Sequence, residues 1–426
     1  MSVNKKESMK KIILFFVLFF SLSGILSAQK LTIGGYGEVA MTRNYYSDNV
    51  YRYSSAASHK DENHGRFDIP HAVIYLSYDF GKGWLMQSEI EFEHLGTGAA
   101  SEKEFEEAGE WETEIEKGGE VALEQFWIQK TFLPQLNVRV GHFVVPVGGL
   151  NNAHEPLEFF TVYRPEGEYT ILPSTWHDTG ISIWGRAGKW RYEAMVVAGL
   201  DAFMFGRDNF IKGGAGSPFE FKVANKYGYA GRIDNYSIKG LRLGLSGFYG
   251  ESMHNTYPDE MSTGKYADIK GRVLFGAFDF TYSGHNILAR GNADYGTLSD
   301  AGIISNVKRN RTANNAPYDK SPVGKAAFAV GGEIGYDVAA HISKMKSDGQ
   351  KLYVFGRYEC YNPYIADSSQ EVAGFTRKQR IAAGVNWFPI PQIVVKAEYS
   401  HRFLRSGYND EPSVSLGIAY MGFFTK

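Results

Sequence analysis

Residues 376–402 have the sequence TRKQRIAAGVNWFPIPQIVVKAEYSHR, in which two runs of alternating polarity flank a Pro-Ile-Pro turn at 389–391. In the first run Ile381 and Val385 share one face, while Lys378 and Arg380 share the other, because successive side chains of a strand point opposite ways. The run 392–402 alternates in the same manner. This stretch therefore predicts an antiparallel hairpin with one apolar face and one charged face.

The same pattern continues from about Thr32 to Phe424, with short turns and long polar loops in alternation. Outer-membrane barrels have tight turns on one rim and long loops on the other, with lipid outside and water inside. A soluble barrel has polar residues outside and no reason for this asymmetry. We predict an all-β fold, a transmembrane antiparallel β-barrel of about 16 strands with an inward-folded constriction loop. The expected strands lie near 32–46, 66–80, 84–94, 120–132, 136–146, 179–186, 189–200, 225–235, 240–251, 266–282, 287–297, 324–337, 351–362, 376–388, 392–402 and 412–424.

The chain is rich in aromatic residues, at 15% of all positions. Several of them belong to apolar strand faces and lie beside short turns, where amphipathic rings would form an interfacial girdle. Ordinary core aromatics would not gather at one rim. The residues of this predicted girdle are Phe80, Trp84, Trp190, Tyr282, Tyr336 and Trp387.

The N-terminus predicts export. Four lysines precede the apolar run 12–20, and the small residues Ser27 and Ala28 follow it, which is the pattern of a cleaved signal peptide over residues 1–28. A membrane-anchoring helix is the alternative, although the apolar run is short for a span of about 20 residues. We expect residues 29–426 to form the barrel domain, located in the outer membrane and surrounded by its lipid.

The charged strand faces predict a water-filled lumen of mixed sign, because sixteen strands enclose more space than their own side chains fill. The basic lining residues that we expect are Arg139, Arg191, Lys378, Arg380, Lys396 and Arg402. The acidic lining residues that we expect are Glu89, Glu91 and Glu93, which share one strand face. Wall charges of this kind are also consistent with plain solvation of the lumen.

The segment 147–178 is the candidate constriction loop. It is unusually rich in proline and aromatic residues for an exposed loop, and so should pack against the barrel interior. A surface lid or a trimer contact is the alternative. The charged residues that we expect to face the passage are Glu155, Glu158, Arg164, Glu166, Glu168 and Asp178.

The segment 95–119 carries a dense run of glutamates and predicts an acidic, solvated external arm. It provides the alternative function, a surface binding or adhesion barrel that recruits a partner through this arm. The sixth long loop has the opposite sign, with Lys308, Arg309 and Arg311, and could gather anions at the mouth.

Four short motifs around the constriction loop resemble the phosphate-selective porin O and P family: RVGHFVVPVGG at 139–149, HEP at 154–156, RPE at 164–166 and PSTWHD at 173–178. They cover about 45 residues, while the strand rhythm is similar over nearly all of the predicted mature chain. The resemblance implies a sixteen-stranded, usually trimeric pore. Members of that family use a ladder of arginines and a cluster of lysines for phosphate.

The chain contains no nucleotide-binding or hydrolase motif, and His71, His142, His154 and His177 lack the close spacing of a metal site. We therefore expect no enzyme, no cofactor, no metal and no nucleic-acid partner. A hydrolase that uses Glu89 or Glu91 is a weaker alternative. The predicted function is a homotrimeric porin that lets ions and small hydrophilic solutes diffuse passively, with anions such as phosphate as candidates.

Overall fold

The structure is a computed structural model, and it describes residues 30–47, 63–94, 99–104, 110–115, 120–173, 175–217, 221–256, 266–311, 322–405 and 407–425. The expected signal peptide lies outside the described residues. Within the acidic segment 95–119 only the backbone of 99–104 and 110–115 is described. The side chains of Lys308, Arg309 and Arg311 are likewise not described.

Seventeen strands of the described chain form one antiparallel sheet, and two more form a separate hairpin. The strands of the large sheet are β1 (Lys30–Asn44), β2 (His64–Asp68), β3 (His71–Gly81), β4 (Trp84–Glu93), β7 (Glu120–Leu133), β8 (Leu136–Val144), β9 (His177–Ala187), β10 (Trp190–Val197), β11 (Gly228–Asn235), β12 (Leu241–Glu251), β13 (Arg272–Gly284), β14 (Ile287–Leu298), β15 (Ala326–Asp337), β16 (Lys351–Ile365), β17 (Lys378–Ile390), β18 (Ile393–Phe403) and β19 (Glu411–Phe423).

β2 and β3 are two parts of one crossing, because both pair with β1, at residues 40–44 and 30–37 respectively. The chain leaves the ladder between them at Ile69 and Pro70, and proline cannot donate a hydrogen bond to a neighbouring strand. Counted as one crossing, they bring the total to sixteen, which confirms the predicted strand number. All sixteen predicted segments coincide with observed strands.

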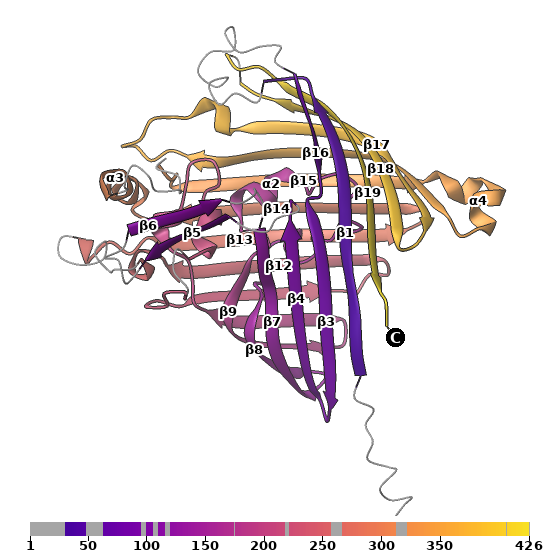
Figure 1. The fold of residues 1–426 in the computed structure, drawn as a ribbon, viewed down its shortest axis with the longest axis horizontal. Coiled ribbons are helices and arrows are strands. Elements are labelled where there is room, and N and C mark those ends of the chain that lie inside the picture. Colours follow the sequence, from indigo (N-terminus) through magenta and orange to yellow (C-terminus); the bar gives the residue numbers. More distant parts are fainter. Residues whose placement is uncertain are drawn as a thin grey trace, which may run out of the picture.

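The sheet closes on itself. Each crossing pairs with the next one along the chain, and β1 pairs with β19 from Gly34 opposite Phe423 to Asn44 opposite Ser413 (Figure 1). Closure leaves the barrel without an edge strand that could pair with another chain. The predicted all-β closed barrel is therefore confirmed.

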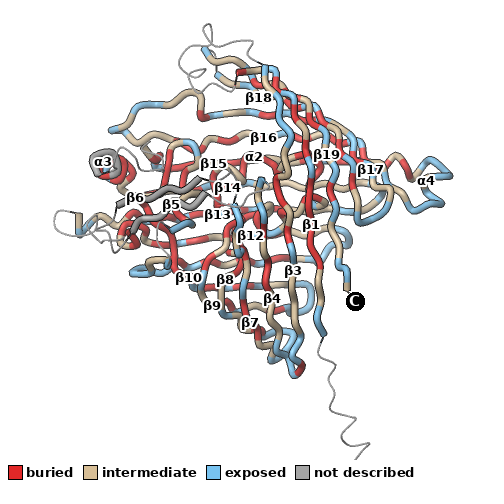
Figure 2. The backbone as a smooth tube through the Cα atoms, in the orientation of Figure 1, coloured by how far each residue is buried: buried red, intermediate tan, exposed pale blue. Residues whose placement is uncertain are grey.

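The two faces of each strand differ as the alternation predicts. On β18, Val395 is exposed by 37% whereas the adjacent Lys396 is exposed by only 2%. Figure 2 shows buried and exposed positions interleaved along the strands. Aromatic residues of the predicted girdle, such as Trp84, Trp190 and Trp387, are exposed on the outer face. The outer surface is thus apolar, and the charges of the wall point inward.

Short elements lie in the connections between the barrel strands. They are the hairpin of β5 (Ala99–Glu104) and β6 (Glu110–Ile115), the helices α2 (Glu166–Ile171), α3 (Ala301–Arg311) and α4 (Ser343–Ser347), and the 3-10 turns η2 (Ala202–Met204), η3 (Lys212–Ala215), η4 (Met253–Asn255), η6 (Val338–His341) and η7 (Gly374–Thr376). In the described part of the chain, no helix is both long and apolar enough to cross a membrane.

Candidate functional site: the loop inside the barrel

The segment between β8 and β9 turns into the barrel at two glycines. Gly148 has φ +84°, a conformation that suits glycine, and a Cβ there would lie 2.3 Å from the carboxylate of Glu168. That carboxylate accepts hydrogen bonds of 3.0 Å from the backbone N–H of Gly149 and of Asn151. The motif PVGG in the sequence thus builds the entry of the loop around one buried glutamate.

Glu168 is unusual for a carboxyl group because it has no basic partner among its hydrogen bonds. Burial raises the pKa of Glu168 and the nearby Asp279 raises it further, while the N–H donors of Asn151 and Gly149 lower it. The resulting pKa is about 7. The docked loop therefore favours the protonated form of Glu168 more strongly than an exposed loop would.

Lys396 on β18 holds the middle of the loop. Its ammonium donates hydrogen bonds to the backbone carbonyls of Pro156, Phe159 and Thr161, at 2.6, 3.0 and 2.8 Å. These bonds use all three of its donors. Its Nζ also lies 4.2 Å from the centroid of the Phe159 ring. A single wall residue thus binds three backbone carbonyls of the loop, which would otherwise be buried without a hydrogen-bond donor.

Neighbouring wall residues hold the next part of the loop. Glu398, also on β18, accepts a hydrogen bond of 2.6 Å from the backbone N–H of Val162. The Phe160 ring stacks on Phe355 at 5.3 Å and packs against Tyr353. Apolar contacts with β16 and a polar contact with β18 therefore fix the neighbouring loop residues Phe160 and Val162.

Helix α2 lies against β15 and β16 and presents Glu166 to two arginines. Arg402 donates to both carboxylate oxygens of Glu166, and Arg380 lies 3.5 Å away. Burial raises the pKa of Glu166, but the charges of Arg380 and Arg402 outweigh this and hold it well below its ordinary value. The N–H of Gly167 donates to Glu359 at 3.0 Å. The C-terminal half of the loop is thus anchored by charge.

The six charged residues predicted to face the passage occupy two kinds of position. Glu158 is the exposed one, with Arg290 at 3.7 Å, and Glu155 and Glu166 are partly exposed. Arg164, Glu168 and Asp178 are buried, although Arg164 and Glu168 each border one of the cavities described below. Their burial has a reason: each holds the fold of the loop or of a neighbouring connection, as the contacts of Glu168 above and of Arg164 and Asp178 below demonstrate.

Arg164 connects the loop to the wall, whereas Asp178, the second residue of β9, binds the connection between β10 and β11. Arg164 donates to the carbonyl of His154 at 3.2 Å and to the Tyr36 hydroxyl at 3.4 Å. Asp178 accepts from the N–H of Gly199 at 3.0 Å and pairs with Lys222 at 3.2 Å. Lys222 was not a candidate from sequence, because it lies in a long connection whose path alternation does not predict.

The predicted basic lining residues all point inward with partners. Besides those already described, Arg139 lies 4.6 Å from the Trp127 ring centroid, Arg191 bonds Glu193 at 2.5 Å, and Lys378 lies 3.3 Å from Glu411. The wall charges are therefore mostly neutralised in pairs, as a lumen of mixed sign predicts.

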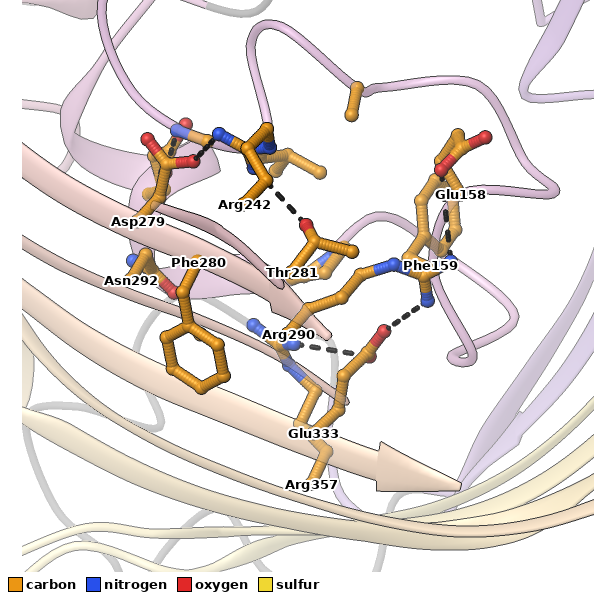
Figure 3. Close-up of a pocket in the computed structure, with 16 residues that line it drawn as sticks. Glu158, Phe159, Arg242, Asp279, Phe280, Thr281, Arg290, Asn292, Glu333 and Arg357 are labelled. Atoms are coloured by element: carbon orange, nitrogen blue, oxygen red, sulfur yellow. Dashed lines mark hydrogen bonds and ion pairs between the residues drawn. The ribbon is translucent and has the colours of Figure 1, made fainter. Parts of the chain in front are cut away.

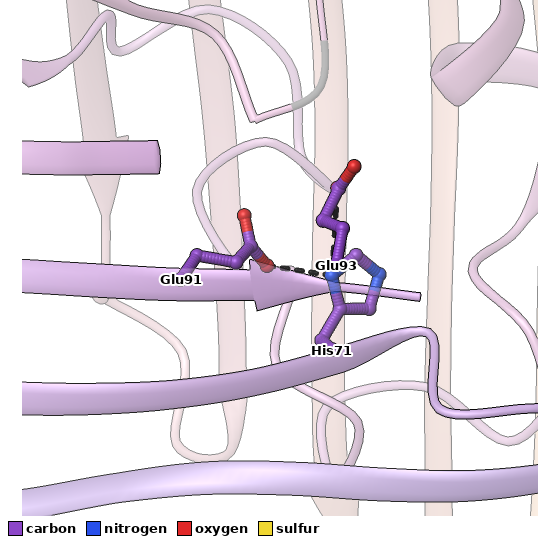
Figure 4. A group of neighbouring side chains, drawn as sticks. All are labelled: His71, Glu91 and Glu93. Carbon is purple, nitrogen blue, oxygen red and sulfur yellow. Dashed lines mark hydrogen bonds and ion pairs between the residues drawn. The ribbon is translucent and has the colours of Figure 1, made fainter. Parts of the chain in front are cut away.

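The predicted acidic lining residues lie on β4, at the foot of the loop. Glu89 and Glu91 are buried, whereas Glu93 is partly exposed. His71 on β3 bonds Glu91 at 2.5 Å through Nδ1 and lies 3.7 Å from Glu93, as Figure 4 shows. The sequence spacing of the histidines gave no sign of this grouping, because the partners come from different strands.

Three cavities border the loop. The largest, of about 610 Å³, opens near the short turn between β11 and β12; it is lined by Arg186, Arg191, Arg232, Lys239 and Arg242 against Asp234 and Glu158. A second, of about 360 Å³, lies toward the long loops and is lined by charges of both signs, Arg66, Arg164, Arg380, Arg402, Glu38, Asp68, Glu93, Glu166 and Glu398. The lumen is thus divided by the loop into a cationic chamber and a mixed one.

The third cavity is narrow, about 60 Å³, and lies between the loop and the wall strands β13 to β16 (Figure 3). Arg290 and Arg357 both bond Glu333 there, at 2.8 and 3.1 Å, and Arg242 bonds Asp279 at 2.5 Å. Glu158 projects from the loop on the opposite side. Paired charges therefore surround the narrowest of these spaces.

No protein-family model matches the chain. A protein of Aquifex aeolicus (strain VF5), described as an uncharacterized protein, is 28% identical over 389 residues, which cover 89% of this chain and 77% of that protein. Among solved structures, the anion-selective porin from Comamonas acidovorans superposes with a TM-score of 0.52 at 10% identity, covering 92% of this chain and 100% of that chain.

Two further solved structures are similar. The outer membrane channel DcaP of Acinetobacter baumannii has a TM-score of 0.51 at 11% identity, covering 92% of this chain and 97% of that one. Salmonella typhi OmpF in complex with daunomycin has a TM-score of 0.51 at 8% identity, again covering 92% and 97%. The fold is therefore that of the sixteen-stranded outer-membrane porins.

Proposed function

We propose that this protein is an outer-membrane porin that allows ions and small hydrophilic solutes to diffuse passively, and that the loop 147–178 is its constriction. The observation that carries the proposal is the position of this loop. Wall residues from β15, β16, β17 and β18 hold it inside a closed barrel whose outer face is apolar. A surface lid or a trimer contact would not need anchors on so many inward-facing side chains.

The larger of the two chambers supports a weak preference for anions. Five basic and two acidic side chains line the larger chamber, so its net charge is positive. Many of these charges are paired, which reduces their field. Rings of side chains with the same charge select ions, whereas paired charges mainly keep the wall hydrated. We therefore propose a modest preference for anions and no dedicated phosphate site.

Planar-bilayer recording of the purified, refolded protein tests the channel. Deletion of residues 155–170 should raise the single-channel conductance, because it removes the loop from the lumen. An equal conductance in the deletion variant and the wild type would show that the loop is not the constriction. Wild-type protein that is folded by circular dichroism yet forms no channels would refute the porin function itself.

Reversal potentials in KCl and in potassium phosphate gradients test the selectivity. We expect a small preference for chloride over potassium and similar permeability for phosphate after allowance for its size. A strong preference for phosphate would replace our proposal with a dedicated phosphate channel. The homotrimer implied by the family resemblance is tested separately, by the mass of the protein in detergent.

A further inference from the structure

Three potential metal ligands meet where the loop leaves the wall. Glu89 belongs to β4, Glu124 to the adjacent strand β7, and His154 to the loop itself. One ligand atom of each lies within 4.8 Å of the other two. The three residues are 35 or 30 positions apart in the chain, which explains why sequence spacing gave no indication of a site.

All three side chains are buried, with exposed fractions of 1%, 2% and 6% for Glu89, Glu124 and His154. In the described part of the chain, Glu89 Oε1, Glu124 Oε2 and His154 Nε2 are buried without a hydrogen-bond partner. Buried polar atoms are normally satisfied by a partner. At this point one imidazole nitrogen and two carboxylate oxygens therefore form a convergent donor set for a ligand.

The remaining atoms of these side chains are held in place. His154 Nδ1 lies 3.1 Å from the carbonyl of Asn151, which turns Nε2 toward the carboxylates, and Gln125 donates to Glu89 Oε2. A histidine that ligates a metal usually donates its other ring N–H in this way.

The charge balance also favours a cation. Glu91 and Glu155 lie near Glu89 and Glu124, whereas Arg164 is the basic side chain in this group, at 3.8 Å from Glu91. One guanidinium does not balance four carboxyl groups in a buried place. Either protons or a further cation must supply the difference.

The neighbouring group of His71, Glu91 and Glu93 provides a useful contrast. There, His71 Nδ1 is already bonded to Glu91 (Figure 4). The Nε2 atom of His71 lies 3.8 Å from Glu38. None of the described atoms of these three side chains is among the buried unpaired ones. That group is a complete hydrogen-bonded network, whereas the group at His154 is not.

We propose that Glu89, Glu124 and His154 bind one divalent transition-metal ion, with Zn²⁺ or Mn²⁺ as the expected occupants, and that this ion fastens the base of the loop to the wall. An imidazole with two carboxylates suits such ions better than Ca²⁺ or Mg²⁺, which take oxygen ligands. Tetrahedral bonds of about 2.0–2.2 Å to one ion place its ligand atoms about 3.3–3.6 Å apart. The three side chains need to move together by less than about 1 Å.

The test uses the untagged, refolded barrel, stripped with EDTA and titrated with Zn²⁺ and with Mn²⁺ by calorimetry. We expect one ion per chain, and binding at least tenfold weaker in Glu124→Gln and in His154→Ala. His71→Gln is the matched control and should bind as the wild type does. Absence of binding by the wild type at micromolar ion concentrations, or unchanged binding by Glu124→Gln and His154→Ala, overturns the proposal.

If neither of those two variants folds, as judged by circular dichroism, X-ray absorption of the Zn²⁺-loaded wild type decides. The expected first shell contains one imidazole nitrogen and carboxylate oxygens. A shell without imidazole nitrogen overturns the proposal. Both measurements report the ion directly and do not depend on whether the barrel conducts.

Discussion

Replacing Lys396 by methionine should release the middle of the loop. Methionine has a similar length and apolar stem but no donors, so the carbonyls of Pro156, Phe159 and Thr161 lose their three hydrogen bonds. Hydrogen bonds from a charged donor contribute about 1.5–3 kcal/mol each, but three on one ammonium are not additive. Removal of one partner from a buried charged network costs about 3–5 kcal/mol.

A loss of about 3 kcal/mol lowers the ratio of docked to released loop by about two orders of magnitude. Single-channel recordings of Lys396→Met should therefore show larger open-channel noise and a raised mean conductance. Lys130→Met is the control, because Lys130 bonds the carbonyl of Lys82 at a short turn, away from the loop. If both Lys396→Met and Lys130→Met have the open-channel noise and the mean conductance of the wild type, Lys396 does not hold the loop.

Four other outcomes follow from the same geometry. Gly148→Ala should raise open-channel noise as Lys396→Met does, because the new methyl group would overlap the Glu168 carboxylate. Recordings of Gly148→Ala that are as quiet as those of the wild type would count against this turn as the loop's entry. Because the pKa of Glu168 is raised to about 7, docking of the loop should be tightest below about pH 4.5 and should weaken as the pH rises through 7. Open-channel noise recorded at several pH values in the wild type and in Glu168→Gln measures this effect. A pH response that the variant retains would contradict it. The double variant Arg186→Glu/Lys239→Glu should lower the chloride-to-potassium permeability ratio about twofold at low salt, with little change at 1 M KCl, where screening is strong. Deletion of 95–119 should leave conductance unaltered, since its hairpin is separate from the barrel sheet, and a changed conductance would place this arm in the passage.

The barrel could be predicted from sequence because its pattern is local. Whether Val395 or Lys396 points outward follows from the two-residue period of a strand, and the strand number follows from counting turns. The connections have no such period. The hairpin β5–β6 and the helices α2 and α3 therefore lay outside what alternation predicts.

The site was predictable only in outline. The proline and aromatic content of 147–178 indicated that the loop packs inside, but its partners come from distant strands, such as Tyr36 of β1 and Lys396 of β18. Charge in the sequence does not distinguish Glu158, which is exposed, from Glu168, which is buried beneath the turn at Gly148. Likewise, the meeting of Glu89, Glu124 and His154 depends on the register of two strands and the path of the loop.

The pairing of β1 with β19 also determines the order in which this molecule can assemble. The Thr42–Ser415 contact joins residues 373 positions apart, and the contact of Val162 with Glu398 spans 236. Such distant contacts form late, because closing a long loop costs conformational entropy that earlier contacts must first offset. Translation and export of β18 must therefore be complete before the loop can dock. A chain that stops before Lys396 would lack both the pairing of β1 with β19 that closes the barrel and the ammonium group that holds the middle of the loop. The last tenth of the polypeptide therefore controls both closure and constriction.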